Sequence, residues 1–465
     1  MAVLSASEAP KFQVQVAALI IGGGACGMIA ALAAKDAGAE PIIVERDAAP
    51  SGSTALSSGM IPACGTRQQA DCNVTDTVQI MSDDIQRKAH EEADAVLVRR
   101  LCELSGPVID WLCERHDLNL TLVEGFLYPG HSAQRMHAPP SRAGADLMAD
   151  LNRAVAAADI PVMTQGHVTD LYADTNGGVT GVRIKRPDGE VEYIGCEVLI
   201  LACNGFGGNA DMVQAHIPDM AGALYFGHQG NQGDAIIWGQ ALGAATRHLG
   251  SYQGHGSVAD PHGILISWAL MMQGGLQINR DGKRFSNEHH GYSEQARRVI
   301  AQPGGIAWNL FDARLLQLGR EFEDFRQAEA LGAIQPAQTI SALAQMMSVP
   351  VAQLTETLAQ VAHYASGTDH DVFGRDFSKT PVLEPPYYAL KVTGALFHTQ
   401  GGLAVDGEAR VLRHDGTALP NLLAGGGAAC GVSGSHDWGY LSGNGLLTAA
   451  TLGYRAGVTA AKLLR

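Results

Sequence analysis

The hydrophobic pattern near the N-terminus predicts a strand, a tight turn, a helix and a second strand. Residues 14–21 are a nearly unbroken apolar run, which is typical of a buried strand. The sequence GGGACG follows at residues 22–27, and residues 28–37 then have the alanine-rich pattern of a helix. A second apolar run at residues 41–44 ends at Glu45. This order is the β–turn–α–β unit that begins a doubly wound sheet.

Gly22, Gly24 and Gly27 have the G-x-G-x-x-G spacing of a dinucleotide-binding turn. One glycine makes the bend, one lets backbone approach a pyrophosphate, and one lets the helix pack on the strand. The start of the helix attracts phosphate because its N–H groups are unpaired and its dipole is positive there. Glu45 would accept hydrogen bonds from ribose hydroxyls. A glycine-rich turn without function is the alternative, and the flanking strands, helix and acid favour the binding site.

Later apolar runs predict that the same part of the molecule is completed at the far end of the chain. Strands are predicted over residues 162–173, 181–185, 197–202 and 422–424, and a final helix over residues 446–464. A first-strand phosphate loop completed by a C-terminal strand and helix is the layout of FAD enzymes.

The middle of the chain has mostly helical patterns, so we expect a second domain there. The predicted fold is α/β: a Rossmann-like FAD-binding domain, with a parallel sheet and helices, interrupted by a smaller α+β capping domain. The expected boundaries are 1–248 and 387–465 for the FAD-binding domain and 249–386 for the capping domain.

Composition excludes several classes of protein. The chain has 465 residues, 46% of them hydrophobic, with 32 Lys+Arg against 47 Asp+Glu and a net charge of −15. An acidic balance without a basic cluster argues against nucleic acid as a partner. The apolar runs are only strand-length, so no membrane span is predicted. The eight cysteines lack metal-ligand spacing, so no metal site is predicted, and without a signal-peptide pattern at the N-terminus we expect a cytoplasmic protein.

Motifs along the chain resemble those of the flavoprotein subunits of fumarate reductase and succinate dehydrogenase, and of the related 3-ketosteroid dehydrogenases. The motifs are residues 22–27, 52–59, 203–208, 230–234, 279–288, 398–402 and 439–444. The resemblance covers residues 13–464 and implies bound FAD. The family often attaches its flavin to a histidine in the loop that here covers residues 52–59. That loop has no histidine, so the FAD is expected to be non-covalent.

The serines and glycines of residues 52–59 suit a loop around a pyrophosphate or the flavin edge, with a surface turn as the alternative. On the C-terminal strand the family tends to have Glu or Asn where this chain has Gly426, which weakens one flavin contact. The predicted FAD-binding residues are Gly22, Gly24, Ala25, Cys26, Gly27, Glu45, Arg46, Gly52, Ser53, Thr54, Ser58, Gly59, Val168, Asn204, Gly205, Asp234, Gly426, Gly443 and Leu446.

Two tyrosines occupy the positions where the fumarate-reducing branch has its arginines. Tyr292 stands at the position of the acid/base arginine, and Tyr440 stands at the position of the arginine that binds the substrate carboxylate. A phenol does not replace a bidentate guanidinium, so fumarate or succinate chemistry of the usual kind is not expected. A tyrosine at each of these two positions resembles the active-site pattern of the ketosteroid dehydrogenases. That resemblance implies Tyr292 as the base, and Tyr440 with the Asn444 amide as donors to the carbonyl oxygen.

A phenol is a poor base unless something lowers its pKa, and Tyr128, His255 and His289 are candidates for that assistance. His398 matches a substrate-binding histidine of the fumarate branch, and His255 lies near another. The alternative for each is a packed, hydrogen-bonded side chain. The remaining predicted substrate contacts are Tyr128, Ser435 and Trp438.

These residues predict an FAD-dependent dehydrogenase that desaturates a CH–CH bond beside a carbonyl, in a small polar ketone or oxo-acid. The alternative is the reverse reaction, reduction of a C=C bond conjugated to a carbonyl or carboxylate. A flavin-binding sensor without turnover and an NAD(P)-linked enzyme are weaker alternatives. Because the chain has no haem-attachment or ferredoxin-like cysteine pattern, its electrons would pass to a separate partner.

Overall fold

The computed structural model describes residues 2–125 and 127–465, and within them the larger sheet has nine strands. Its main order is β1-β8-β9-β10-β2-β3-β7, and β21 pairs with both β10 and β20. Strands β21, β10, β2, β3 and β7 run parallel, while β9 is antiparallel to both neighbours. The strands are β1 (Ala2–Ser5), β2 (Val14–Ile21), β3 (Pro41–Val44), β7 (Val162–Met163), β8 (His167–Ala173), β9 (Val179–Lys185), β10 (Val191–Leu201), β20 (Arg410–Leu412) and β21 (Ala418–Ala424).

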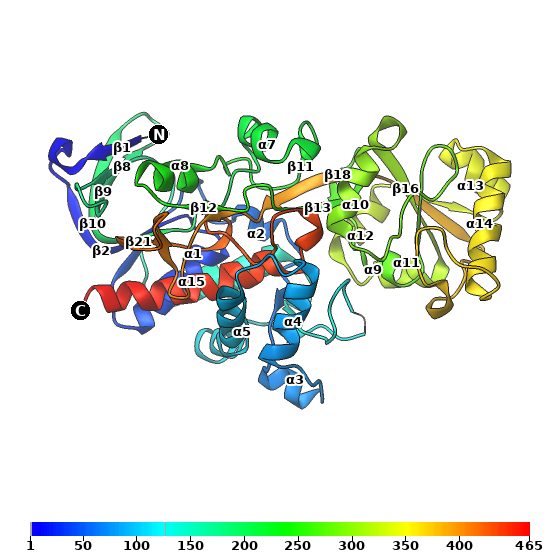
Figure 1. Cartoon of the computed structure of the whole chain (residues 1–465), viewed down its shortest axis with the longest axis horizontal. Helices are drawn as coiled ribbons and strands as arrows, with labels where there is room; N and C mark the ends of the chain where they lie inside the picture. Colours follow the sequence, from blue (N-terminus) through cyan, green and yellow to red (C-terminus); the bar gives the residue numbers. More distant parts are fainter. Residues whose placement is uncertain (1, 126) are drawn as a thin grey trace.

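Helices α1 (Ala25–Asp36) and α15 (Asn444–Leu463) pack closely against each other although they come from opposite ends of the chain (Figure 1). Glycines make this contact possible. A Cβ atom at Gly457 would lie 2.1 Å from the Ala30 carbonyl oxygen, and one at Gly453 would lie 2.6 Å from that of Cys26. The remaining helices of this part are α2 (Gly52–Ala55), α3 (Arg67–Asp71), α4 (Val78–Lys88), α5 (Ala95–His116), α6 (Gly144–Ala157), α7 (Ala210–His216) and α8 (Asp234–Ala241).

A second, seven-stranded sheet lies at the other end of the molecule, with order β14-β13-β18-β16-β15 and with β11 and β17 paired to β18 (Figure 1). Its strands are β11 (Leu224–Tyr225), β13 (Tyr252–Ala259), β14 (Ile264–Leu265), β15 (Leu276–Ile278), β16 (Ile306–Asp312), β17 (Ile334–Ala337) and β18 (Tyr387–Thr399). The helices around it are α9 (Ala269–Met272), α10 (Tyr292–Ile300), α11 (Ala313–Gly319), α12 (Glu323–Ala330), α13 (Ile340–Met347) and α14 (Val351–Ala365). The expected mixed α/β fold with a smaller capping domain is confirmed.

The domain boundary expected at residue 387 coincides with the first residue of β18. Because β18 pairs with β13, β16 and β17, we propose that this strand belongs to the capping sheet and connects the two parts through its last residues. Short strands complete the fold: β4 (Ile61–Pro62), β5 (Thr121–Leu122) and β6 (Met136–Ala138) form one small sheet, and β12 (Thr246–Arg247) pairs with β19 (Gly402–Leu403).

Two arginines and two carboxylates form a buried ion cluster in the capping part. Arg284 binds Glu288 and Asp371, each at 2.7 Å, and Arg375 binds Glu288 at 3.1 Å. Burial alone would raise the pKa of Glu288, but the two guanidinium groups outweigh it and lower that pKa to about 2. Within the described residues, none of the helices has both the length and the apolar character that a bilayer crossing requires.

Candidate functional site

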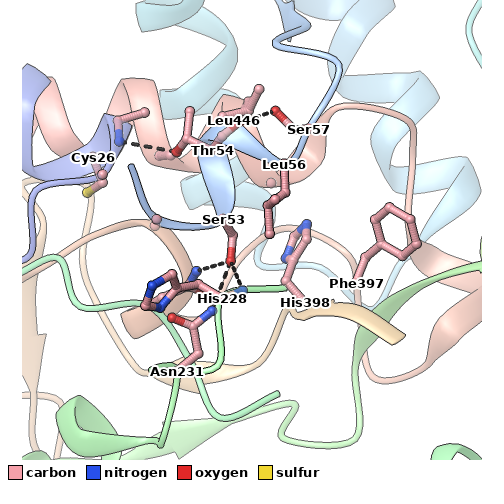
Figure 2. A pocket seen from close by; sticks show the side chains of 18 of the residues that line it. Cys26, Ser53, Thr54, Leu56, Ser57, His228, Asn231, Phe397, His398 and Leu446 are labelled. Atoms are coloured by element: carbon pink, nitrogen blue, oxygen red, sulfur yellow. Dashed lines mark hydrogen bonds between the residues drawn. The ribbon is translucent and has the colours of Figure 1, made fainter. Parts of the chain in front are cut away.

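A large cavity extends from the glycine turn after β2 to a cluster of aromatic side chains from the capping part. It contains about 1830 Å³ of space, its open mouth included, and polar loops line one end while aromatic rings line the other. In Figure 2 the loop residues Ser53, His228 and Asn231 gather at one side of this cavity, and His398 and Phe397 lie further along it.

The glycine turn has the backbone of a dinucleotide-binding loop. Gly22 has φ +108°, and a Cβ atom there would lie 2.5 Å from the Ala202 carbonyl oxygen. A Cβ atom at Gly27 would lie 1.9 Å from the carbonyl oxygen of Gly22, so only glycine lets α1 start so close to β2. The Glu45 carboxylate accepts hydrogen bonds from the N–H groups of Gly23 (2.7 Å) and Asp47 (2.9 Å). The turn and its acid are therefore held as one unit.

The loop at residues 52–59 is tied to the cavity wall through Ser53. Its Oγ accepts hydrogen bonds from the backbone N–H of His228 (3.1 Å) and from the side-chain amides of Asn231 (2.9 Å) and Asn204 (3.4 Å) (Figure 2). Thr54 Oγ1 accepts from the first N–H of α1, at Ala25 (3.2 Å). These contacts support a role in binding a cofactor rather than a surface turn.

An unsatisfied carboxylate oxygen shows that this end suits a ligand with hydroxyl groups. Asp234 begins α8 and lines the cavity, and its Oδ1 is buried without a hydrogen-bond partner among the described residues. Burial raises the pKa of this carboxyl group, and Arg46 opposes the rise. The donors, the helix start and the orphaned acceptor together fit FAD.

Most of the predicted FAD-binding residues line the cavity, and three glycines lie just behind its wall. The three are Gly27, Gly59 and Gly205. Their surroundings give a steric reason for glycine: a Cβ atom at Gly205 would lie 1.9 Å from Thr399 Oγ1, and one at Gly59 would lie 3.1 Å from the Ala143 carbonyl oxygen. His228, which the sequence did not single out, also lines the cavity, and its Nε2 lies 2.6 Å from Asp47 Oδ2.

At the aromatic end three tyrosines gather: Tyr292, Tyr440 and Tyr128. The rings of Tyr292 and Tyr440 are 6.1 Å apart in a T-shaped arrangement. The Tyr292 hydroxyl lies near the side-chain hydroxyls of Tyr440 and Ser442, which both act on its pKa. Burial raises the pKa of Tyr292 well above its ordinary value, and it raises those of Tyr440 and Tyr128 to about 12. All three phenols are therefore protonated at neutral pH.

The two predicted histidine assistants have hydrogen-bond partners other than the Tyr292 hydroxyl. The His255 ring stacks on the Tyr292 ring at 4.7 Å, and its Nδ1 accepts a hydrogen bond from Ser257 N–H (3.1 Å). Burial lowers the pKa of His255 to about 3, so the ring is a neutral wall of the site. His289 lies outside the cavity lining, and its Nε2 is 3.1 Å from the Met271 carbonyl oxygen.

His398 lines the cavity beside Tyr440, with ring centroids 5.7 Å apart. The Gln400 amide donates to His398 Nδ1 (2.7 Å), and Gln400 Oε1 accepts from the Ser433 hydroxyl (2.8 Å). The Asn444 side-chain amide donates to that hydroxyl (3.0 Å). Burial lowers the pKa of His398 to about 4. Sequence reasoning missed Gln400 and Ser433, although Gln400 lies inside the 398–402 motif.

Three predicted site residues have other positions than expected. The Asn444 backbone N–H donates to the Leu441 carbonyl (3.0 Å), so it is not the expected donor to a substrate oxygen. The backbone N–H groups of Gly445 and Gly443 face the Tyr440 hydroxyl instead. Ser435 donates to Glu92, and Trp438 stacks on His90 at 4.1 Å; both lie outside the cavity lining because their segment turns toward the surface.

The aromatic end is uncharged. Among the described residues of the lining, Arg46 is the only lysine or arginine, and it lies at the other end, beside Gly230 and Asp234. Phe226, Phe397 and Trp268 complete the wall, and the two phenylalanine rings stack at 4.7 Å. A carboxylate would find no guanidinium here, whereas a neutral ring would find aromatic surfaces and hydroxyl groups.

A dinucleotide site that opens into an aromatic pocket with buried phenol hydroxyl groups is typical of a flavin-dependent oxidoreductase. The model of the family described as "FAD binding domain" matches residues 17–446, and the chain belongs to this family. Its cofactor is FAD, and it is an oxidoreductase acting on CH–CH bonds.

Named relatives agree with this membership. A probable fumarate reductase of Shewanella frigidimarina is 28% identical over 446 residues, which cover 96% of this chain and 74% of that protein. The open conformation of a flavocytochrome c3 fumarate reductase superposes with a TM-score of 0.81 at 28% identity, over 97% of this chain and 79% of that one. A 3-ketosteroid-Δ4-(5α)-dehydrogenase from Rhodococcus jostii RHA1 has a TM-score of 0.77 at 24% identity, over 99% of both chains, which shows a shared fold.

Proposed function

We propose that the protein is an FAD-dependent dehydrogenase that desaturates a neutral carbonyl compound next to its carbonyl group. The observation that carries the proposal is the group of buried phenols at an end of the cavity without a cation. Tyr440, supported by the N–H groups at the start of α15, is the donor to the carbonyl oxygen. The aromatic walls favour a cyclic ketone over a dicarboxylate.

The raised pKa values require a route in which no phenol carries a full negative charge. As Tyr292 receives the α-proton of the substrate, it passes its own proton to the neighbouring hydroxyl of Tyr440. Tyr440 in turn passes a proton to the carbonyl oxygen, so the α-carbon is deprotonated while both phenols stay neutral. When bound, FAD supplies the two-electron acceptor for the β-hydride. The electron pair of the broken α C–H bond then forms the C=C bond, and the carbonyl oxygen releases its added proton to solvent, which is the one net proton of the reaction.

The second candidate is the reverse reaction, reduction of a C=C bond conjugated to a carbonyl. The observation that favours it is the same rise in pKa, because a phenol that stays protonated is a ready proton donor to the α-carbon. The similar protein of Shewanella frigidimarina is named as a reductase. In either direction the proposal includes a separate electron partner and a cytoplasmic location.

Anaerobic bleaching of the flavin absorbance tests the proposal. The panel holds cyclohexanone-type ketones, 4-oxocyclohexanecarboxylate, 3-ketosteroids and succinate. We expect a neutral ketone to bleach the flavin, and Tyr292→Phe to slow bleaching by about 10²–10⁴-fold, as is typical for loss of a proton-transfer group. Tyr193→Phe is the control, since Tyr193 lies on β10 outside the cavity lining.

The two candidates give different results. If no ketone bleaches the flavin, but dithionite-reduced flavin is reoxidised by an unsaturated ketone, the enzyme is a reductase and the dehydrogenase proposal is wrong. Rapid bleaching by succinate alone would contradict the neutral-substrate proposal in both directions.

A further inference from the structure

Helix α10 connects the proposed active site to charged groups on two other segments. Its first residue is Tyr292. Two further residues of the same helix, Glu294 and Arg297, form ion pairs with Lys88 and Asp437. Lys88 is the last residue of α4, and Asp437 begins the short 3-10 helix Asp437–Gly439 that precedes Tyr440. Helix α10 thus connects the capping part to α4 and to the 3-10 helix that precedes Tyr440.

The pair of Lys88 with Glu294 is almost fully buried. The side chains are 14% and 7% exposed, and Lys88 Nζ also donates to the His290 carbonyl oxygen (3.1 Å). The Glu294 carboxylate folds back over Gly291, where φ is +147° and an added Cβ atom would lie 2.5 Å from Glu294 Oε2. Lys88 therefore contacts the turn on which Tyr292 is mounted as well as the helix itself.

The pair of Arg297 with Asp437 reaches the second tyrosine. Arg297 Nε lies 2.6 Å from Asp437 Oδ2, and the Asp437 side chain is only 7% exposed. Tyr440 N–H lies 3.5 Å from the carbonyl oxygen of Asp437, so one residue contacts Arg297 by its side chain and the Tyr440 backbone by its main chain. This contact connects the helix that begins with Tyr292 to the segment that leads to Tyr440.

We propose that these two ion pairs form a clamp that holds Tyr292 against Tyr440, with Lys88, Glu294, Arg297 and Asp437 as positioning residues. The pair of Lys88 with Glu294 is nearly buried, whereas the Arg297 side chain of the other pair is 42% exposed. Both kinds of ion pair are weak evidence for stability, because desolvation or solvent screening offsets their attraction, but their geometry is specific. Proton transfer between two phenols needs that specificity, since a shift of about 1 Å can cost about 100-fold in rate. The proposal rests on the proposed function in one respect: that the two tyrosines act together.

The test compares single variants with a charge exchange in the holoenzyme. Arg297→Gln and Asp437→Asn should each lower kcat about 10- to 100-fold while KM changes by less than about threefold. The exchanged double variant, Arg297→Asp with Asp437→Arg, should recover most of the lost rate. Lys88→Met should act like the other single variants. Arg320→Gln is the control, because Arg320 forms a 2.6 Å pair with Glu329 that has no contact with the cavity.

A second readout does not depend on turnover. Hydrogen exchange of the amides in α10 and in residues 433–443 should speed up in each single variant and slow again in the exchanged variant. The clamp is wrong if exchange stays unchanged, or if the single variants lower only the melting temperature and leave kcat intact. If no substrate is found, the exchange data still decide the clamp. Faster exchange in the single variants, restored in the exchanged variant, together with no turnover of any substrate by the unaltered enzyme, would count against the proposed function alone.

Discussion

At the scale of single residues, burial decides the chemistry of this site more than residue type does. The phenols of Tyr292 and Tyr440 are kept protonated, and the rings of His255 and His398 are kept neutral, because a charge at this end of the cavity would lose its hydration. These residues act as a set of neutral hydrogen-bonding groups. Neutral donors favour a ketone oxygen, which develops charge only during the reaction.

Gln400 should orient His398, because its side-chain amide contacts Nδ1 at 2.7 Å, and Nδ1 also lies 3.2 Å from the Thr399 carbonyl oxygen. Gln400→Met keeps the volume and removes this donor. We expect KM for the ketone to rise about tenfold, the cost of about one hydrogen bond, with FAD binding unchanged. Steady-state kinetics and flavin titration measure both quantities. Gln353→Met, at a partly exposed position on α14 outside the cavity lining, is the control, and an unchanged KM in Gln400→Met would contradict the orienting role.

At the scale of elements, the segments that the sequence predicts best are those with local causes. Strand β2 and strand β3 have the predicted bounds, since their apolar runs are bracketed by glycines or a charged residue. Helix α1 begins three residues earlier than predicted, at Ala25, because the glycine turn itself supplies the helix start. In the middle of the chain, the helical pattern of residues 313–331 forms two helices, α11 and α12, because Gly319 ends the first and its missing side chain makes room for the ring of Phe325.

Two glycines of the turn should respond differently to the same substitution. In Gly27→Ala the new Cβ atom would lie 1.9 Å from the Gly22 carbonyl oxygen, so we expect a lower melting temperature of the apoprotein and loss of FAD. In Gly24→Ala the nearest protein atom would be 3.7 Å away at φ −76°, so the apoprotein should melt normally and only FAD affinity should fall. Thermal denaturation and flavin titration separate these results. Equal effects of the two substitutions on stability would contradict the steric explanation.

At the scale of the whole molecule, function depends on two sheets brought together around one cavity. The larger sheet and its helices provide the dinucleotide end, and β13, β18 and α10 bring the aromatic end to it. Many titratable groups are enclosed in this arrangement. Burial lowers the pKa of His131 and His255 to about 3 and that of His137 and His398 to about 4.

These histidines predict that acid begins to destabilise the fold at a pH above the ordinary pKa of a carboxyl group. In the folded state they stay neutral, while in the unfolded chain they take up protons below about pH 6.5. The unfolded state therefore binds more protons between about pH 6.5 and 4, and stability falls as the pH falls through that window. We expect the free energy of unfolding to fall by up to about 1.4 kcal/mol per pH unit for each histidine. Urea denaturation at pH 7 and at pH 5 measures this loss.

A variant identifies the source of this slope. His131→Gln should reduce the slope of the unfolding free energy against pH by about one proton, because it removes one group that takes up a proton on unfolding. Nε2 of His131 contacts the Ser442 carbonyl oxygen (3.0 Å), and a neutral amide can donate to the same oxygen. A stability that stays constant between pH 7 and pH 5 would show that these histidines are protonated in the folded protein and would contradict the prediction.

The sequence by itself determined the parts of this protein whose causes are local or fixed by spacing. The glycine turn with Glu45, the FAD cofactor, the tyrosines in place of arginines and the absence of a histidine in residues 52–59 are all written in short motifs. The tertiary structure decided what those motifs do together. Only the packing of distant segments shows that the Asn444 N–H is already bonded and that Trp438 lies outside the cavity. It also shows that Arg297 reaches Asp437 across 140 residues. The physical reason is that burial, hydrogen-bond partners and pKa values belong to the assembled site and not to any one segment.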